Sequence, residues 1–120
     1  MSRQEKLAAG LTLMVAAAIA VLTLMPLSSP QIGGIEQSDK IYHALAFAAL
    51  AFPIALLQPR WLVLAVPFFA AFGGIIEIVQ PFVGRECSLT DWLADLVGVA
   101  LGVVAGRATA VSMPVAWRLR

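Results

Sequence analysis

Polar and ionisable side chains gather near the ends of three apolar segments of this chain. The residues there that could do chemistry are Asp39, Lys40, His43, Glu77, Gln80, Arg85, Asp91 and Asp95. Asp91 and Asp95, four residues apart, share one helix face, and Asp95 lies one turn, about 6 Å, deeper in its segment. Ionisable groups inside an apolar segment are costly unless they face the interior of a bundle, so they are functional candidates.

Two chemistries suit this set. A histidine beside carboxylates can exchange protons, so His43, Glu77 and Asp91 are the catalytic candidates. Arg85 carries a planar fork that fits phosphate or carboxylate, and Lys40 adds a point charge, which together predict binding of an anionic group. The other residues assigned to this binding site are Asp39, Gln80 and Asp95. A metal site made of His43 and two carboxylates is conceivable, but the spacing carries no metal-ligand signature, so we expect neither a metal nor a cofactor.

Several of these residues also have a purely structural explanation. Ser88 and Asp91 match the S-x-x-D form of a weak capping box, which would make Asp91 a helix-start residue. Lys40 could extend to lipid head groups, and a single histidine near a helix start is often only hydrogen-bonded. Asp95 and Glu77 are harder to explain in this way, since neither lies at a helix terminus. Together the residues favour a shared functional site.

Four apolar stretches must position these residues, at about 7–27, 41–57, 61–80 and 91–106. A helix needs about 20 apolar residues to cross a bilayer core. Hydrophobic residues make up 61% of the 120 and charged residues 12%, against about 45–50% and about 25% in soluble domains. The composition excludes a soluble fold and predicts an all-α integral membrane protein, a four-helix bundle in which residues 1–120 form one domain.

The basic residues predict the orientation of the bundle. With the N-terminus in the cytoplasm, the cytoplasmic segments hold six of the eight Lys and Arg residues, namely Arg3, Lys6, Arg60, Arg107, Arg118 and Arg120. The opposite face holds only Lys40 and Arg85, together with most of the acidic residues. This asymmetry follows the positive-inside rule, so we expect both termini in the cytoplasm and the polar cluster at the extracytoplasmic face.

The fourth segment carries a small residue at every fourth position, which allows close helix packing. These positions are Ala94, Gly98, Gly102 and Gly106. Ala44 and Ala48 on the second segment offer a matching flat surface, so packing within the chain is favoured. A homodimer through the Gly98, Gly102 and Gly106 face is the alternative.

The ordered motifs resemble those of the VanZ-like family of small bacterial membrane proteins. They are DK-x-x-H at 39–43, E-x-x-Q at 77–80, Gly84-Arg85, and D-x-x-x-D at 91–95 followed by Gly98. The resemblance covers roughly residues 39–102, and the family usually has asparagine at the position of Asp95. It implies a multi-pass protein of the bacterial cytoplasmic membrane. The founding member is associated with low-level resistance to the glycopeptide teicoplanin, and the resemblance supplies no established reaction.

The leading hypothesis is that the polar pocket binds an anionic lipid or a lipid-linked envelope intermediate, with chemical modification as a further step. The expected partners are therefore membrane lipids or lipid-linked precursors. Two alternatives are a proton-coupled transporter and a non-catalytic protein that masks a target or docks a partner. Nucleotide-binding loops, a nucleophile elbow and a basic nucleic-acid patch are all absent from the sequence, so no nucleic-acid partner is expected.

Overall fold

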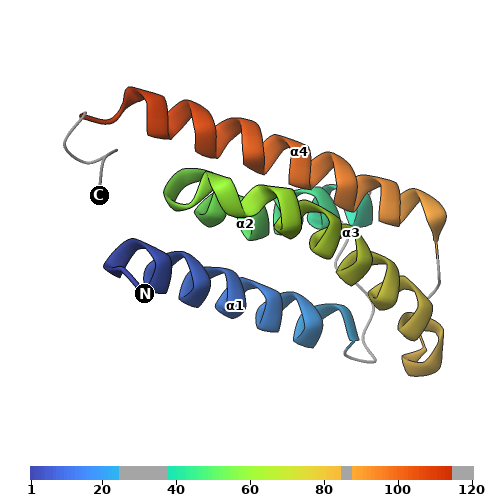
Figure 1. Cartoon of the computed structure of the whole chain (residues 1–120). Coiled ribbons are helices and arrows are strands. Elements are labelled where there is room, and N and C mark those ends of the chain that lie inside the picture. The colour runs from blue at the N-terminus through green and yellow to red at the C-terminus, as the bar shows by residue number, and fades with distance from the viewer. Residues whose placement is uncertain (25–37, 85–87, 115–120) are drawn as a thin grey trace.

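The computed structural model describes residues 1–24, 38–84 and 88–114, and within these ranges it is helical (Figure 1). The long helices are α1 (Arg3–Leu24), α2 (Ser38–Leu57), α3 (Leu62–Val79) and α4 (Leu89–Ser112). Short 3-10 turns, η1 (Pro59–Trp61) and η2 (Gln80–Val83), lie on either side of α3. Each long helix has the length and apolar composition needed to cross a membrane. The all-helical, four-helix prediction is confirmed.

The bounds of α1 and α4 differ from those of the apolar stretches at about 7–27 and 91–106: α1 begins earlier, and residues 25–27 lie outside the described residues. α1 begins at Arg3 because Ser2 and Glu5 form a reciprocal capping box, with Ser2 N donating to Glu5 Oε1 and Glu5 N donating to Ser2 Oγ, both at 3.1 Å. α4 runs from Leu89 to Ser112 and so extends beyond the apolar stretch at about 91–106 on both sides. No helix breaker follows Gly106 until Pro114.

The helices alternate in direction, which places two distinct ends on the molecule (Figure 1). One end holds the start of α1 and the end of α4, and the other holds the start of α2, the end of α3 and the start of α4. The longest dimension is 48 Å, which exceeds the roughly 30 Å thickness of a hydrocarbon core. The three helix ends that carry the polar candidates are therefore brought together at one end.

The most extensive helix contact is between α2 and α4, and glycines make it close. A Cβ atom built on Gly98 would lie 2.9 Å from Ala44 Cα, and one on Gly102 would lie 2.9 Å from Ala48 Cα. Only residues without a side chain permit backbones to approach so closely. The predicted packing of this face against Ala44 and Ala48 is confirmed, and a homodimer through the same face would have to displace α2.

Most of the buried side chains are apolar, and so are many of the exposed ones. Buried core residues include Phe47, Leu50, Ala51, Ile54, Phe69, Ile76 and Val99. Large hydrophobic side chains exposed on the outer surface include Leu13, Met14, Leu22, Val63, Leu64, Phe68, Ile78, Leu101 and Val104. Exposed apolar area spread over several helices in this way is typical of surfaces that meet lipid.

Candidate functional site

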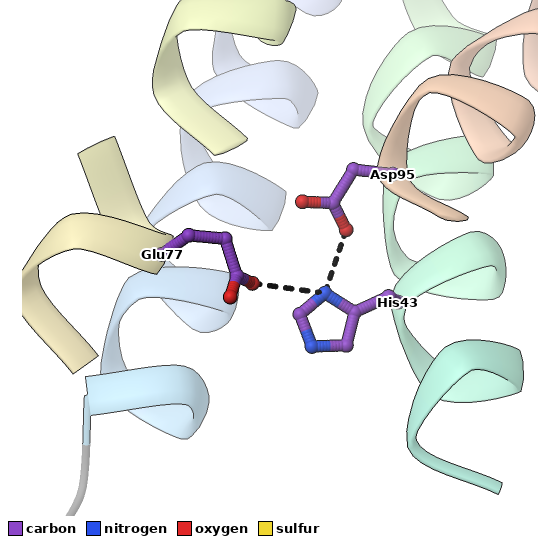
Figure 2. A group of neighbouring side chains, drawn as sticks. All are labelled: His43, Glu77 and Asp95. Carbon is purple, nitrogen blue, oxygen red and sulfur yellow. Dashed lines mark hydrogen bonds and ion pairs between the residues drawn. The ribbon is translucent and has the colours of Figure 1, made fainter. Parts of the chain in front are cut away.

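His43, in the second turn of α2, projects between α3 and α4 (Figure 2). Its Nδ1 lies 2.6 Å from Asp95 Oδ1, a hydrogen bond between α2 and α4. The same nitrogen lies 3.9 Å from Glu77 Oε1 on α3, and Nε2 lies 3.9 Å from Asp91 Oδ2. The imidazole is thus surrounded by three carboxylates from two neighbouring helices.

Asp95 is the deepest polar member of this site, with 1% of its surface exposed. Its place on α4 follows from the four-residue spacing after Asp91, which puts both carboxylates on the inward face. Gly73 on α3 makes the necessary room, because a Cβ atom there would lie 2.7 Å from Asp95 Oδ2. A glycine one turn before Glu77 therefore determines whether Asp95 can reach His43.

Glu77 connects the end of α3 to the start of α4. Its Oε2 accepts a hydrogen bond from the backbone N–H of Ser88 at 3.0 Å. Ser88 is the N-cap of α4, and its hydroxyl accepts from the N–H of Asp91 at 3.3 Å, which is one half of the predicted capping box. The N–H of Ser88 donates to Glu77 and not to Asp91. Glu77 is 4% exposed, and its second oxygen, Oε1, is the one directed toward His43.

The lysine and glutamine predicted to bind a ligand have partners inside the chain. Lys40 Nζ lies 3.4 Å from Asp91 Oδ1, so its charge is directed at a carboxylate. Gln80 is buried, and its Nε2 donates to the carbonyl oxygen of Thr23 on α1 at 3.2 Å. Gln80 therefore connects α1 to the end of α3.

Five of the eight predicted site residues converge in the described structure, namely Lys40, His43, Glu77, Asp91 and Asp95. Gln80 lies near them in sequence and points to α1. Asp39 belongs to α2, but its side chain lies outside the description, and Arg85 lies outside the described residues altogether.

Three contributors were not predicted: Gly73, the N–H of Ser88 and the carbonyl of Thr23. Of these, only Gly73 leaves a sequence signal, since it lies four residues before Glu77.

The converging residues bring more negative than positive charge to this end of the bundle. Three carboxylates face one ammonium group and one imidazole. Donor atoms of His43, Glu77 and Asp95 all lie within 4.8 Å of one another, and these are residue types that ligate metals. The arrangement can therefore orient an imidazole for proton transfer or hold a cation.

A separate cavity of about 100 Å³ lies at the opposite end of the bundle. Its lining includes Gln4, Leu57, Arg107 and Met113. Arg107 Nη1 donates to the carbonyl oxygen of Ala55 at 3.2 Å, which fixes the guanidinium against α2. The cavity is far from His43 and plays no part in its chemistry.

Comparison of the chain with protein-family models, with curated proteins and with solved structures finds no match. The geometry of the site therefore carries the functional argument.

Proposed function

We propose that this chain is a multi-pass protein of the bacterial cytoplasmic membrane, of the VanZ-like type that its motifs resemble, with both termini in the cytoplasm. Four helices of sufficient length and an apolar outer surface support membrane insertion. The start of α1 and the end of α4 lie at one end of the bundle (Figure 1), and basic residues are concentrated there: Arg3, Lys6, Arg60 and Arg107. The positive-inside rule then directs the His43 end to the extracytoplasmic side.

The site at that end binds the head group of an anionic lipid or of a lipid-linked envelope intermediate. The observation that carries this proposal is the placement of His43 among carboxylates from α3 and α4 at the helix ends, where head groups lie. Lys40 has a side chain 37% exposed, so it can exchange its contact with Asp91 for a phosphate. Arg85 remains a sequence-based candidate for the same contact.

The Asp95–His43 pair supplies a proton-transfer group for modification of the head group. When Nδ1–H donates to Asp95, the lone pair lies on Nε2, and the carboxylate holds the ring in that tautomer. Nε2 can then accept a proton from a hydroxyl group of the bound molecule. Asp91, 3.9 Å from Nε2, stabilises the imidazolium that results.

Lipid retention tests the proposal. The full chain and its Lys40→Ala and His43→Ala variants are purified from bacterial membranes, and the bound lipids are identified by native mass spectrometry. Lys6→Ala, at the opposite end of the bundle, is the matched control. We expect a phosphorylated or lipid-linked species that the wild type and Lys6→Ala retain and the two site variants lose. Equal retention of bulk phospholipid by all four proteins would contradict head-group recognition.

A cellular assay addresses the envelope role. Expression of the wild type in a teicoplanin-sensitive bacterium is expected to change susceptibility to the antibiotic, because a protein that binds envelope precursors alters their availability. His43→Ala, expressed to the same level, is expected to abolish the change. An unaltered susceptibility with the wild type would argue against an envelope precursor as the ligand.

A further inference from the structure

One nitrogen of His43 and the carboxylates of Glu77 and Asp95 converge on the space between α2, α3 and α4 (Figure 2). We infer that these three side chains bind a divalent transition-metal ion. Each comes from a different helix, which is why their sequence spacing carries no metal-ligand signature.

Two buried oxygen atoms in this space have no hydrogen-bond partner among the described residues. They are Glu77 Oε1 and Asp95 Oδ2, on side chains that are 4% and 1% exposed. A buried carboxylate oxygen without a partner costs free energy, and two neighbouring carboxylates also repel each other. A cation bound by the two carboxylates offsets both charges, and Glu77 Oε1 gains the partner that it lacks.

The separations of the donor atoms are close to those required by one ion. Nitrogen and oxygen ligands lie about 2.0–2.2 Å from Zn²⁺, so two ligands of the same ion are about 3.0–3.6 Å apart. His43 Nδ1 lies 2.6 Å from Asp95 Oδ1 and 3.9 Å from Glu77 Oε1, on either side of this range. The three ligand atoms all lie within 4.8 Å of one another, so the side chains must draw together by about 1 Å for one ion to contact all three.

The second nitrogen of the imidazole lies 3.9 Å from Asp91 Oδ2, longer than a hydrogen bond, so the ring must shift toward Asp91 before that carboxylate becomes the partner that a metal-bound histidine needs. Histidine ligands usually donate their other ring N–H to a carboxylate, which fixes the ring and raises its basicity. Asp91 Oδ2 lies 3.9 Å from Nε2, and Lys40 holds Asp91 from the other side at 3.4 Å. Asp91 is therefore a positioning residue for the ion.

The donor types select the class of ion. An imidazole nitrogen favours transition metals over Mg²⁺ and Ca²⁺, whereas two carboxylates are also acceptable to Mn²⁺. The set of one nitrogen and two carboxylates fits Zn²⁺ or Mn²⁺, and Zn²⁺ is expected to bind more tightly because of the general affinity order of divalent ions.

A bound ion also explains how so acidic a site could accept an anionic head group. This part of the inference rests on the proposed function. The ion would balance the charges of Glu77 and Asp95 and leave coordination positions for a phosphate oxygen. Because it replaces the Nδ1 proton, His43 serves in this state as a ligand and not as the proton acceptor. Binding of the head group is then the part of the proposed function that the ion supports.

The test measures metal binding by the full, tag-free chain in detergent, by equilibrium dialysis against Zn²⁺ and, separately, Mn²⁺. We expect one Zn²⁺ per chain, with affinity reduced more than tenfold in Asp95→Asn and in Glu77→Gln. Glu5→Gln is the matched control, because Glu5 lies at the opposite end and glutamine preserves its capping contact with Ser2. Cys87→Ser removes the only thiol and is expected to leave binding unchanged.

Asp91→Asn should weaken binding by about 10- to 100-fold, as changes to groups that orient a ligand do. Circular dichroism identifies any variant that fails to fold. If a variant does not fold, two measurements on the wild type test the inference in its place: the number of Zn²⁺ ions bound per chain, and the rise in the wild-type thermal midpoint when Zn²⁺ is added. Absence of bound Zn²⁺ and Mn²⁺ in the wild type, or equal affinity in Asp95→Asn and Glu5→Gln, would overturn the inference.

Repeating the lipid analysis after treatment with a chelator separates the two proposals. Loss of the phosphorylated lipid on chelation supports both. Retention of that lipid by a protein that binds no metal would leave the proposed function standing and refute the ion. Metal binding without any selective lipid would support the ion and refute the head-group role.

Discussion

The pair of adjacent glycines in α3 offers a sharp test of how the site is built. A Cβ atom on Gly73 would lie 2.7 Å from Asp95 Oδ2, whereas one on Gly74 would lie 3.5 Å from Trp92 Nε1, an ordinary contact distance. Both positions are inside the same helix, so alanine gains the same helix propensity at each, about 0.5–1 kcal/mol. The two substitutions therefore differ only in what the new methyl group meets.

At position 73 the methyl group displaces a carboxylate and not a backbone, because Asp95 Oδ2 is the end of a side chain. Asp95 must then rotate away from His43 and lose a hydrogen bond worth about 1.5–3 kcal/mol when one partner is charged. We expect Gly73→Ala to be less stable than Gly74→Ala by about 1.5–3 kcal/mol.

Nuclear magnetic resonance of the imidazole provides the direct assay, because His43 is the only histidine in the chain. In metal-free wild-type protein the ¹⁵N shifts should report a proton on Nδ1, held there by Asp95. Gly73→Ala should shift the ring toward mixed tautomers, while Gly74→Ala leaves it unchanged. Denaturant unfolding in detergent gives the stability difference. Identical histidine spectra in all three proteins, with equal stabilities, would refute the placement of Asp95 against His43.

Three further predictions concern packing and capping. Gly98→Val should lower the free energy of unfolding in detergent by about 1–3 kcal/mol, because its side chain meets the backbone of α2. Gly10→Ala is the control, since a Cβ atom there has nothing within 4 Å, and it should stabilise the protein slightly. Equal changes in stability for the two variants would contradict the close approach of α2 and α4. Trp92→Phe removes the 2.9 Å hydrogen bond to the carbonyl of Ala70 and should cost about 0.5–1.5 kcal/mol. Slow hydrogen exchange of the Trp92 indole N–H in the wild type is the second readout. Ser88→Ala removes the N-cap of α4 and should cost about 1 kcal/mol; unchanged amide exchange at the start of α4 would argue against it.

The parts of the fold that could be predicted from sequence depend on short-range periodicity. The four-residue spacing of Asp91 and Asp95 predicted a common buried face, and both are buried. The repeat of Gly98 and Gly102 predicted a close contact, and Ala44 and Ala48 provide it. In both cases the helix geometry alone relates position in sequence to position on a face.

The remaining details depend on how the helices rotate and cross, which no local pattern determines. The sequence could not show that Gln80 turns to Thr23 on α1 while Glu77, one turn away, turns to His43. It could not show which imidazole nitrogen faces which carboxylate, or that Gly73 leaves room for Asp95. The start of α1 could have been predicted, since Ser2 and Glu5 have the S-x-x-E spacing of a capping box.

The pairing of α2 with α4 has a consequence for the order in which the protein is made. α2 emerges from the ribosome well before its main partner, and α3 is synthesised between them. Until α4 is complete, the groove at Ala44 and Ala48 is uncovered and His43 lacks its hydrogen-bond acceptor. The His43 site therefore cannot form until α4 has been synthesised, and a chain truncated before Asp95 would leave the small-residue face of α2 at Ala44 and Ala48 without its partner.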